Sequence, residues 1–452
     1  MVQSLLTARA LRDGNPPTDR DGLLAWVQER GITRVDLKIG DLTGRLRHLS
    51  MPARKLADAL DHGVGFAGSH YGFSGPVDED MVMVPDASTA WADPFAEVPA
   101  VSFLAQPVRA GTTERFARDP RAVAERAEAY LVSTGVATHS LWLPELEFHL
   151  APAGGLVHDG GAAAHRDGYH ASPPVDRHAG FRARAVQLLE AAGVPVKYDH
   201  HETGVEGQME IELDFGGLVR TADVVLLGKY ILRNLAVQEG LQAVFLPKPM
   251  ADASGNGMHV HLKLLDDERP VFAGDGYAGL SRVALSFVAG VLVHVRSLAA
   301  FTNPSTNSYR RLVPDMEAPV SASFARGDRT AAIRIPGYAV RPADRRMEYR
   351  PLDATANAYL AFSALLLAGL DGVERGLDPV ALGFDPAAEP PTRFPRHLEE
   401  ALDALEDDHE YLERGGVFPT MLLEEWHATK REEVRRLELR PHPAEFAMYL
   451  DL

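Results

Sequence analysis

Four short segments of this chain alternate apolar and ionic residues with a period of two, and this pattern constrains the fold more than any other feature of the sequence. The segments are LPELEFHL (143–150), GQMEIELDF (207–215), GMHVHLKL (257–264) and RRMEYRP (345–351). Because successive side chains of a β-strand point to opposite faces, each segment predicts a strand with one apolar face and one ionic face. On the first strand the ionic face carries Glu145, Glu147 and His149.

The composition of the ionic faces separates two interpretations. A sheet with one face in solvent is the simpler interpretation of any single strand, but solvated faces usually include Ser, Thr, Lys and Gln. These four faces use almost only Glu, His and Arg. If the strands share one sheet, several carboxylates converge, and they stay ionised only beside cations. Hard oxygen ligands favour two Mg²⁺ or Mn²⁺ ions, and nearby Arg side chains suit a phosphate, so the pattern predicts phosphoryl transfer.

Charge and composition exclude several classes of protein. The 452 residues carry a net charge of −17 and include no cysteine. An acidic chain is a poor partner for nucleic acid, whereas a small anion such as ATP needs only a local group of Arg residues and metal. The lack of cysteine excludes disulfides, thiol nucleophiles and Cys-based metal sites. Arg9 and Arg12 come too early for a signal peptide, and His294 and Arg296 interrupt the apolar stretch 283–301. We therefore expect a cytoplasmic protein without a membrane span.

Strand, turn and helix signals divide the chain into two parts. Residues 1–107 predict a small mixed domain with a hairpin over 34–51 and a short helix over 53–63. Residues 65–73, GFAGSHYGF, are too rich in glycine for a helix and too irregular for a strand, so we expect a loop there. Residues 108–121 resemble a linker, and 108–452 predict one large domain with helices over 120–135, 177–193, 221–240 and 354–376.

Seven segments of the chain together form a recognisable series: PELEFHL, GYHASPPVD, HHETGVEGQMEIELDF, LPKPMADASGNGMHVHLKL, NPSTNSYRRLVPDMEAPV, AAIRIPGYAVRPADRRMEYRPLDATANAYLAF and HPAEFAMYL. In these segments, and in their order, the chain resembles the glutamine synthetase superfamily, type I class, over nearly its whole length. It implies an α+β fold, with an N-terminal β-grasp domain (1–107) and a C-terminal catalytic α/β domain (108–452) that contains a curved antiparallel sheet. It also implies a homododecamer of two stacked hexameric rings, in which a neighbour's N-terminal domain completes each site.

The resemblance assigns roles to individual residues. The two implied metal sites are Glu147, Glu202 and Glu210 for one ion, and Glu145, His259 and Glu348 for the other. The implied substrate residues are Gly255, Arg311, Glu317 and Arg350 for glutamate, Arg329 and Arg334 for the transferred phosphate, and His261 and Arg346 for ATP. In the implied reaction ATP phosphorylates the γ-carboxylate of glutamate and an amine then attacks the acyl carbon. Glu317 would close the site and take the proton. We interpret Glu212 and His149 as structural, and we assign no role to the paired His200 and His201.

One departure from the family pattern bears on the amine. Family members that use ammonia carry an Asp in a segment FDGSSI, where this chain has FAGSHY. Ala67 replaces the Asp and His70 replaces the second serine, while Ser69 is kept. Loss of a carboxylate weakens attraction for a small cation and leaves room for a carbon chain. Tyr169 matches a tyrosine beside the amine site. The resemblance therefore favours the branch that makes γ-glutamylated amines, with an alkylamine, ethanolamine or a polyamine as substrate rather than ammonia.

Two alternatives remain open from the sequence. The chain is a glutamine synthetase that uses ammonia if His70 or Asp78 substitutes for the lost Asp, or it is an inactive structural or regulatory relative. The six implied metal ligands and Glu317 argue against inactivity. Ser254 stands where the family usually has Asn, and Asn256 is a candidate replacement for it. The loop 377–391 has no Tyr, so we expect no control by adenylylation there.

Overall fold

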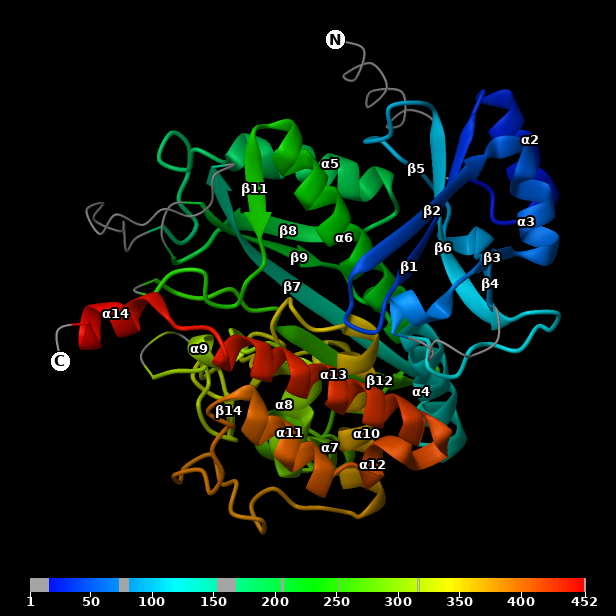
Figure 1. Ribbon diagram of the computed structural model, residues 1–452. Coiled ribbons are helices and arrows are strands. Elements are labelled where there is room, and N and C mark those ends of the chain that lie inside the picture. The colour runs from blue at the N-terminus through cyan, green and yellow to red at the C-terminus, as the bar shows by residue number, and fades with distance from the viewer. Residues whose placement is uncertain are drawn as a thin grey trace.

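A computed structural model describes residues 16–72, 81–152, 168–204, 207–251, 253–314, 316 and 318–450. It contains two separate sheets, a smaller one near the N-terminus and a larger one that helices cover (Figure 1). The predicted residues Glu317 and Asp78 lie outside the described residues. In the described part, no single helix is long and apolar enough to cross a membrane. Two helices joined at a bend, Arg282–Val293 and Val295–Thr302, reach that length and composition only when taken together.

The smaller sheet has the order β2-β1-β6-β4-β3, and β5 pairs with β6. Its strands are β1 (Arg34–Gly40), β2 (Leu46–Pro52), β3 (Val64–Phe66), β4 (Met81–Pro85), β5 (Trp91–Ala92) and β6 (Ala100–Arg109). Strands β1 and β2 form the predicted hairpin, and β1 runs parallel to β6. Helices α2 (Arg20–Glu29) and α3 (Leu56–His62) belong to the same part, and α3 ends at Gly63, whose φ of 73° suits glycine. This arrangement confirms the β-grasp prediction.

The segment 65–73 is more regular than the sequence indicated. Residues 64–66 form β3, which pairs with β4, and Gly68–Tyr71 form a short 3₁₀ turn, η2. The expectation of a plain loop is therefore wrong for residues 65–71. The glycines do not prevent pairing because a three-residue edge strand needs only one row of backbone hydrogen bonds. The carbonyl of Tyr71 accepts a hydrogen bond from the backbone of Leu42, so the segment stays with its own sheet.

The larger sheet has the order β14-β15-β16-β12-β7-β9-β8, with β10 and β11 paired to β7 and β13 paired to β12. Its strands are β7 (His139–Pro152), β8 (Val196–His201), β9 (Gln208–Leu213), β10 (Gly216–Gly217), β11 (Leu241–Val244), β12 (Val260–Asp266), β13 (Arg269–Pro270), β14 (Phe324–Arg326), β15 (Ile333–Ile335) and β16 (Met347–Tyr349). All of these pairings are antiparallel except β14–β15. The four alternating segments of the sequence therefore become four adjacent strands, β16-β12-β7-β9, which confirms the predicted shared sheet.

The apolar faces of these strands pack against helices. The main helices are α4 (Pro120–Thr134), α5 (Ala179–Ala191), α6 (Leu218–Gln238), α7 (Arg282–Val293), α8 (Val295–Thr302), α9 (Ser308–Arg311), α10 (Ala358–Glu374), α11 (Leu398–Asp407), α12 (Glu410–Glu413), α13 (Thr420–Glu438) and α14 (Pro443–Tyr449). The four predicted helices are α4, α5, α6 and α10, within a few residues at each end. Trp142 of β7 stacks on Phe362 of α10 with ring centroids 5.1 Å apart. Leu146 and Phe148 are fully buried, so β7 turns its Glu residues to the other face.

The two sheets are joined by hydrogen bonds to the turn between β1 and β2. Asn357 caps α10 by accepting a hydrogen bond from the backbone of Tyr359, and its amide also donates to the carbonyls of Asp41 and Leu42. Tyr230 of α6 donates to Asp93 at 2.8 Å. The bonds from Asn357 hold the β1–β2 turn against α10, and the bond from Tyr230 holds α6 against the segment that follows β5.

Candidate active site

The ionic faces of the central strands line a cavity of about 640 Å³. Most of the residues predicted for the site lie around it: Glu145, Glu147, Tyr169, Glu202, Glu210, Gly255, His259, Arg311, Arg329, Arg334, Glu348 and Arg350. Glu145 and Glu147 lie on β7, Glu210 on β9, Arg334 on β15, Glu348 on β16 and Arg311 on α9, and the others lie on segments between these elements. The strands thus bring together residues that are widely separated in the sequence.

One group of carboxylates consists of Glu147, Glu202 and Glu210, whose ligand atoms lie within 4.8 Å of one another. Glu147 and Glu210 are direct partners across the β7–β9 pairing, so their side chains share the same face. Glu202 follows the end of β8, where its backbone N–H donates to the carbonyl of Gln208 at 3.1 Å. Three carboxylates at this separation suit a divalent cation with oxygen ligands.

The second group consists of Glu145, His259 and Glu348, also within 4.8 Å of one another. His259 Nδ1 lies 3.0 Å from Glu145 Oε2. Glu348 is fully buried, forms an ion pair with Arg334, and accepts a hydrogen bond from Arg350 Nη1 at 2.5 Å. Two carboxylates and an imidazole suit Mg²⁺ or Mn²⁺ as ligands.

The crowding of these carboxylates changes their acidity. Burial, together with the charges of Glu147 and Glu210, raises the pKa of Glu202 to about 9. Burial and the neighbouring carboxylates also raise the pKa of Glu210 well above its ordinary value. Burial would raise the pKa of Glu145 too, but hydrogen bonds with His259 and His261 outweigh it and hold that pKa well below the ordinary value. The first group is therefore a site where ionised carboxylates need a cation.

The predicted glutamate residues lie beside the two groups. A Cβ on Gly255 would be 2.2 Å from the carbonyl oxygen of Pro247, so only glycine fits there. Buried Arg311 donates to the carbonyls of Pro351 and Arg350 and lies 3.0 Å from His259 Nε2. Its guanidinium is thus held next to the second group of ligands.

Two family models match this chain: "Glutamine synthetase, catalytic domain" over residues 117–449, and "Glutamine synthetase, beta-Grasp domain" over residues 31–108. This chain belongs to the glutamine synthetase family. It is accordingly an ATP-dependent ligase of that family, in which divalent metal ions take part.

Named relatives and solved structures agree with this membership. A glutamine synthetase of Methylococcus capsulatus is 40% identical and covers 95% of this chain and 99% of its own. A protein of Cupriavidus pinatubonensis named 3-hydroxylaminophenol mutase is 39% identical over 95% of this chain and 98% of its own. The structure of apo GmaS without ligand has a TM-score of 0.83 at 29% identity, covering 96% of this chain and 100% of the other. A cryo-EM structure of Plasmodium falciparum glutamine synthetase has the same fold, with a TM-score of 0.87 at 21% identity over 96% and 99% of the chains.

Several residues predicted for the glutamine synthetase site lie away from the cavity. His261 is fully buried behind it, with Nε2 2.9 Å from Glu145 Oε1, and Arg346 Nε donates to its Nδ1 at 3.3 Å. Their contact with ATP stays a prediction. Ala67 is the N-cap of η2, Ser69 and His70 lie within η2, and none of the three lines the cavity of their own chain. The pocket role of these three residues, which the resemblance assigns to a neighbouring subunit's site, also stays a prediction.

The expectation that Asn256 replaces the family Asn at position 254 is wrong in this structure. Asn256 is fully buried, accepts at Oδ1 from the side chains of His149 and Gln208, and donates to the carbonyls of Val244 and Leu246. Its amide is therefore fully used inside the protein. Ser254 itself lines the cavity. The interpretation of His149 as a packed residue agrees with these contacts.

The cavity also includes residues that were not predicted from the sequence or were left without a role. They are Lys197, Tyr198, His200, Thr203, Gln208, Thr330 and Tyr338. Gln208 has the same strand parity as Glu210, so strict alternation was a signal for it. Tyr169 and Tyr198 both lie near His200, with ring centroids 5.2 Å and 5.9 Å from it. The rings form a partly apolar wall beside the first group of carboxylates.

Metal-free protein should lose stability as the pH rises from about 4.5, the ordinary pKa of Glu, to about 9. The raised pKa of Glu202, about 9, and that of Glu210 mean that the folded state keeps protons that the unfolded state has released. The free energy of unfolding therefore falls as pH rises through this window. Mg²⁺ should offset the loss, so its stabilisation should be larger at the higher pH. Thermal unfolding of EDTA-treated protein, with and without Mg²⁺, measures both effects.

The matched variant for this experiment is Glu202→Gln, which removes one of the titrating groups. It should flatten the pH dependence of the metal-free protein and reduce the stabilisation by Mg²⁺. If Mg²⁺ stabilises the unaltered protein equally at both ends of this pH window, these carboxylates do not bind the cation.

Proposed function

We propose that this ligase joins the γ-carboxylate of L-glutamate to an amine larger than ammonia, with γ-glutamyl phosphate as the intermediate. The proposal rests on one combination of features. Two clusters of acidic and histidine side chains and four arginines surround one cavity, and residue 67 of the same chain is Ala rather than an acid. The family membership supplies the reaction class, while the choice of amine is this chain's own feature.

The side chains around the cavity suit the first half of the reaction. Arg311 and Arg350 provide guanidinium groups that match a carboxylate of glutamate. Arg329 and Arg334 are the cations proposed for the transferred phosphate, where negative charge builds up. The proposed ligands are Glu147, Glu202 and Glu210 for one divalent ion and Glu145, His259 and Glu348 for the other. When bound, such ions neutralise charge on ATP and on the transferred phosphate.

The second half of the reaction forms the amide. The amine nitrogen attacks the γ-carbonyl carbon, the C–N bond forms, and the bond from that carbon to the phosphate oxygen breaks. Phosphate leaves, and the nitrogen loses a proton. We propose that the carboxylate of Glu317 accepts this proton. Tyr169 and Tyr198 offer ring surface to a carbon chain on the amine, a contact worth about 0.8 kcal/mol for each buried methylene. Without a carboxylate at residue 67, ammonium gains less than it does in relatives that have one.

An amine panel tests the proposal. Purified protein with Mg²⁺, ATP and glutamate should release phosphate faster with methylamine, ethylamine, ethanolamine or a polyamine than with ammonia. We expect kcat/KM for the best amine to exceed that for ammonia by at least about tenfold, in the range that one or two apolar contacts supply. Mass spectrometry of the product identifies the γ-glutamyl amide.

The opposite ranking supports the second candidate, a glutamine synthetase that uses ammonia. The 40% identity to a protein with that name favours this candidate. The equally similar mutase shows that relatives at this level of identity carry different activities in their names. If kcat/KM is highest for ammonia, the proposal of a larger amine fails. Absence of glutamate-dependent turnover with every amine would favour an inactive relative.

A further inference from the structure

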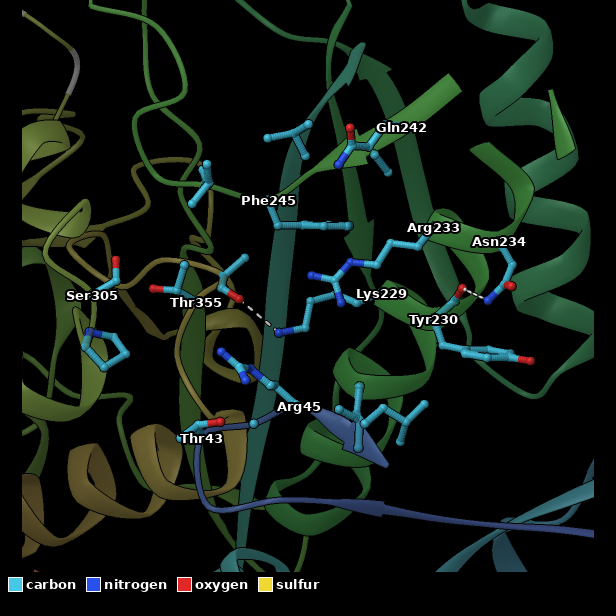
Figure 2. Close-up of a pocket in the computed structure, with 18 of the residues that line it drawn as sticks. Thr43, Arg45, Lys229, Tyr230, Arg233, Asn234, Gln242, Phe245, Ser305 and Thr355 are labelled. Carbon is cyan, nitrogen blue, oxygen red and sulfur yellow. Dashed lines mark hydrogen bonds between the residues drawn. The ribbon is translucent and has the colours of Figure 1, made fainter. Parts of the chain in front are cut away.

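A second cavity of about 640 Å³ lies away from the carboxylate groups, between the two parts of the chain (Figure 2). Its wall is formed by the turn between β1 and β2, by α6, by β11 and by the loop residues Ser305 and Thr355. Neither Glu145 nor any other ligand of the proposed metal sites lines it. Its volume falls within the usual range for sites that bind small molecules.

Three basic side chains point into this cavity. Figure 2 shows Lys229 and Arg233 reaching from α6 towards Arg45 of the β1–β2 turn. Among the described residues, Arg45 and Arg233 form no side-chain hydrogen bond or ion pair, although Arg233 lies over the ring of Phe245 at 5.1 Å. Both residues are exposed to solvent when the whole side chain is counted. Both guanidinium groups are therefore available to donate hydrogen bonds to a ligand.

Lys229 is the innermost of the three cations. Its ammonium is buried and donates to the carbonyl of Ala354 at 2.9 Å. Among the described residues it forms no ion pair, and Asp353 is the acid whose charge acts on it, favouring its charged form. Burial, reinforced by the charge of Arg233, lowers the pKa of Lys229 to about 7. A buried lysine beside an arginine is costly to charge, and an anion reduces that cost.

The rest of the wall offers little negative charge. Glu433 is the only acid among the lining residues that the structure describes, and it already pairs with Lys430 at 3.0 Å. Lys38 also lines the cavity, but its ammonium is used by Asp93 and Ser102. Neutral donors such as Thr43 and Gln242 complete the wall. The arrangement suits a ligand with several negative charges and some hydrogen-bonding groups.

We propose that this cavity binds a small polyanion, a compound with two or more carboxylate or phosphate groups, through Arg45, Lys229 and Arg233. One guanidinium would come from the smaller sheet and two cations from α6, so the ligand would connect the two parts of the chain. The proposal does not depend on which amine the ligase uses, because no residue of the first cavity takes part.

Binding is measured by titration calorimetry on EDTA-treated full-length protein, without nucleotide. Pyrophosphate probes the phosphate class, tricarballylate probes the carboxylate class, and acetate is the singly charged control. We expect at least one polyanion to bind and acetate not to bind. The variants Arg45→Gln and Arg233→Gln should raise Kd by at least about tenfold, the usual loss for a hydrogen bond to a charged group. Both residues are accessible to solvent, so the variants should fold normally.

Two further variants locate the binding. Arg54→Gln removes an equal charge from an exposed position on the smaller part of the chain and should leave Kd unchanged. Arg329→Gln alters the active-site cavity and should also leave Kd unchanged. The proposal is overturned if neither polyanion binds. It is also overturned if Kd is the same in the Arg45→Gln and Arg54→Gln proteins. Binding that is lost in Arg329→Gln but kept in Arg45→Gln assigns the anion to the active site and overturns it as well.

Proton uptake gives an independent check. Since Lys229 is only partly charged near neutral pH, a bound polyanion should raise its pKa and draw a proton from the buffer. Titrations near pH 7.5 in buffers with different ionisation enthalpies should show uptake of roughly half a proton per ligand or more. Zero uptake by a protein that binds the polyanion would contradict the role of Lys229.

Discussion

Glu210→Gln should lower kcat/KM by at least about 100-fold, the largest loss expected from any single isosteric change in the cavity. The substitution keeps the size of the side chain and removes one carboxylate from the group it forms with Glu147 and Glu202. A neutral amide is a poorer ligand for a hard divalent cation. Initial rates at several Mg²⁺ concentrations measure the effect, and the concentration needed for half-maximal activity should rise.

Glu212→Gln is the matched control for this experiment. Glu212 is on the same strand two residues further along, is fully buried, and accepts a hydrogen bond from Lys197 at 2.6 Å. It does not line the cavity, although its carboxylate lies near Glu145 and His261. We expect its removal to lower thermal stability and to change the Mg²⁺ dependence little. If Glu212→Gln changes the Mg²⁺ dependence more than Glu210→Gln does, the ion does not bind at the group that contains Glu210.

Ala67→Asp should shift the preference of the enzyme towards ammonia by about tenfold or more. An added carboxylate attracts ammonium and takes space from the carbon chain of a larger amine. The fold should tolerate the change, because residue 67 is exposed and is the N-cap of η2, with no side-chain hydrogen bond at present. Asp is a favourable residue at such a position. The ratio of kcat/KM for ammonia to that for the best amine is the quantity to measure.

Ala67→Asn separates charge from size in this experiment. Asn has nearly the volume of Asp and is an equally good N-cap, but it carries no charge. It should slow the reaction with large amines without improving the reaction with ammonia. If the ratio for Ala67→Asp equals that for Ala67→Asn, charge at residue 67 does not select the amine, and the proposed substrate loses its main support.

Strand parity alone predicted much of the larger sheet and its ionic face. Glu147 and Glu210 fall on the same face because alternation is a local property of each strand, and their neighbourhood follows once β7 and β9 pair. Glu202 was different, since it follows β8 in an irregular segment that periodicity does not describe. Only the resemblance to the family pointed to it.

Other features depend on contacts that no local pattern contains. The sequence offers Asn256 as a replacement for the family Asn at position 254, but its amide nitrogen donates to the carbonyls of Val244 and Leu246 in the interior. Lys229 and Arg233 lie four residues apart on a mostly buried helix. From the sequence alone, either cation could equally form an ion pair with an acidic side chain. Their approach to Arg45 became visible only when the turn of the smaller sheet was placed against α6.

The contact between Asn357 and the β1–β2 turn has a consequence for synthesis on the ribosome. Asn357 donates to the carbonyl of Asp41, 316 residues earlier in the chain. At about 5 to 20 residues per second, roughly 15 to 60 s pass between the synthesis of the two residues. During that interval the hairpin of β1 and β2 can form by itself, but the start of α10, which later binds its turn, does not yet exist. The carbonyls of Asp41 and Leu42 therefore lack this partner until nearly four-fifths of the protein has been made, which makes the turn a natural place for a chaperone to act.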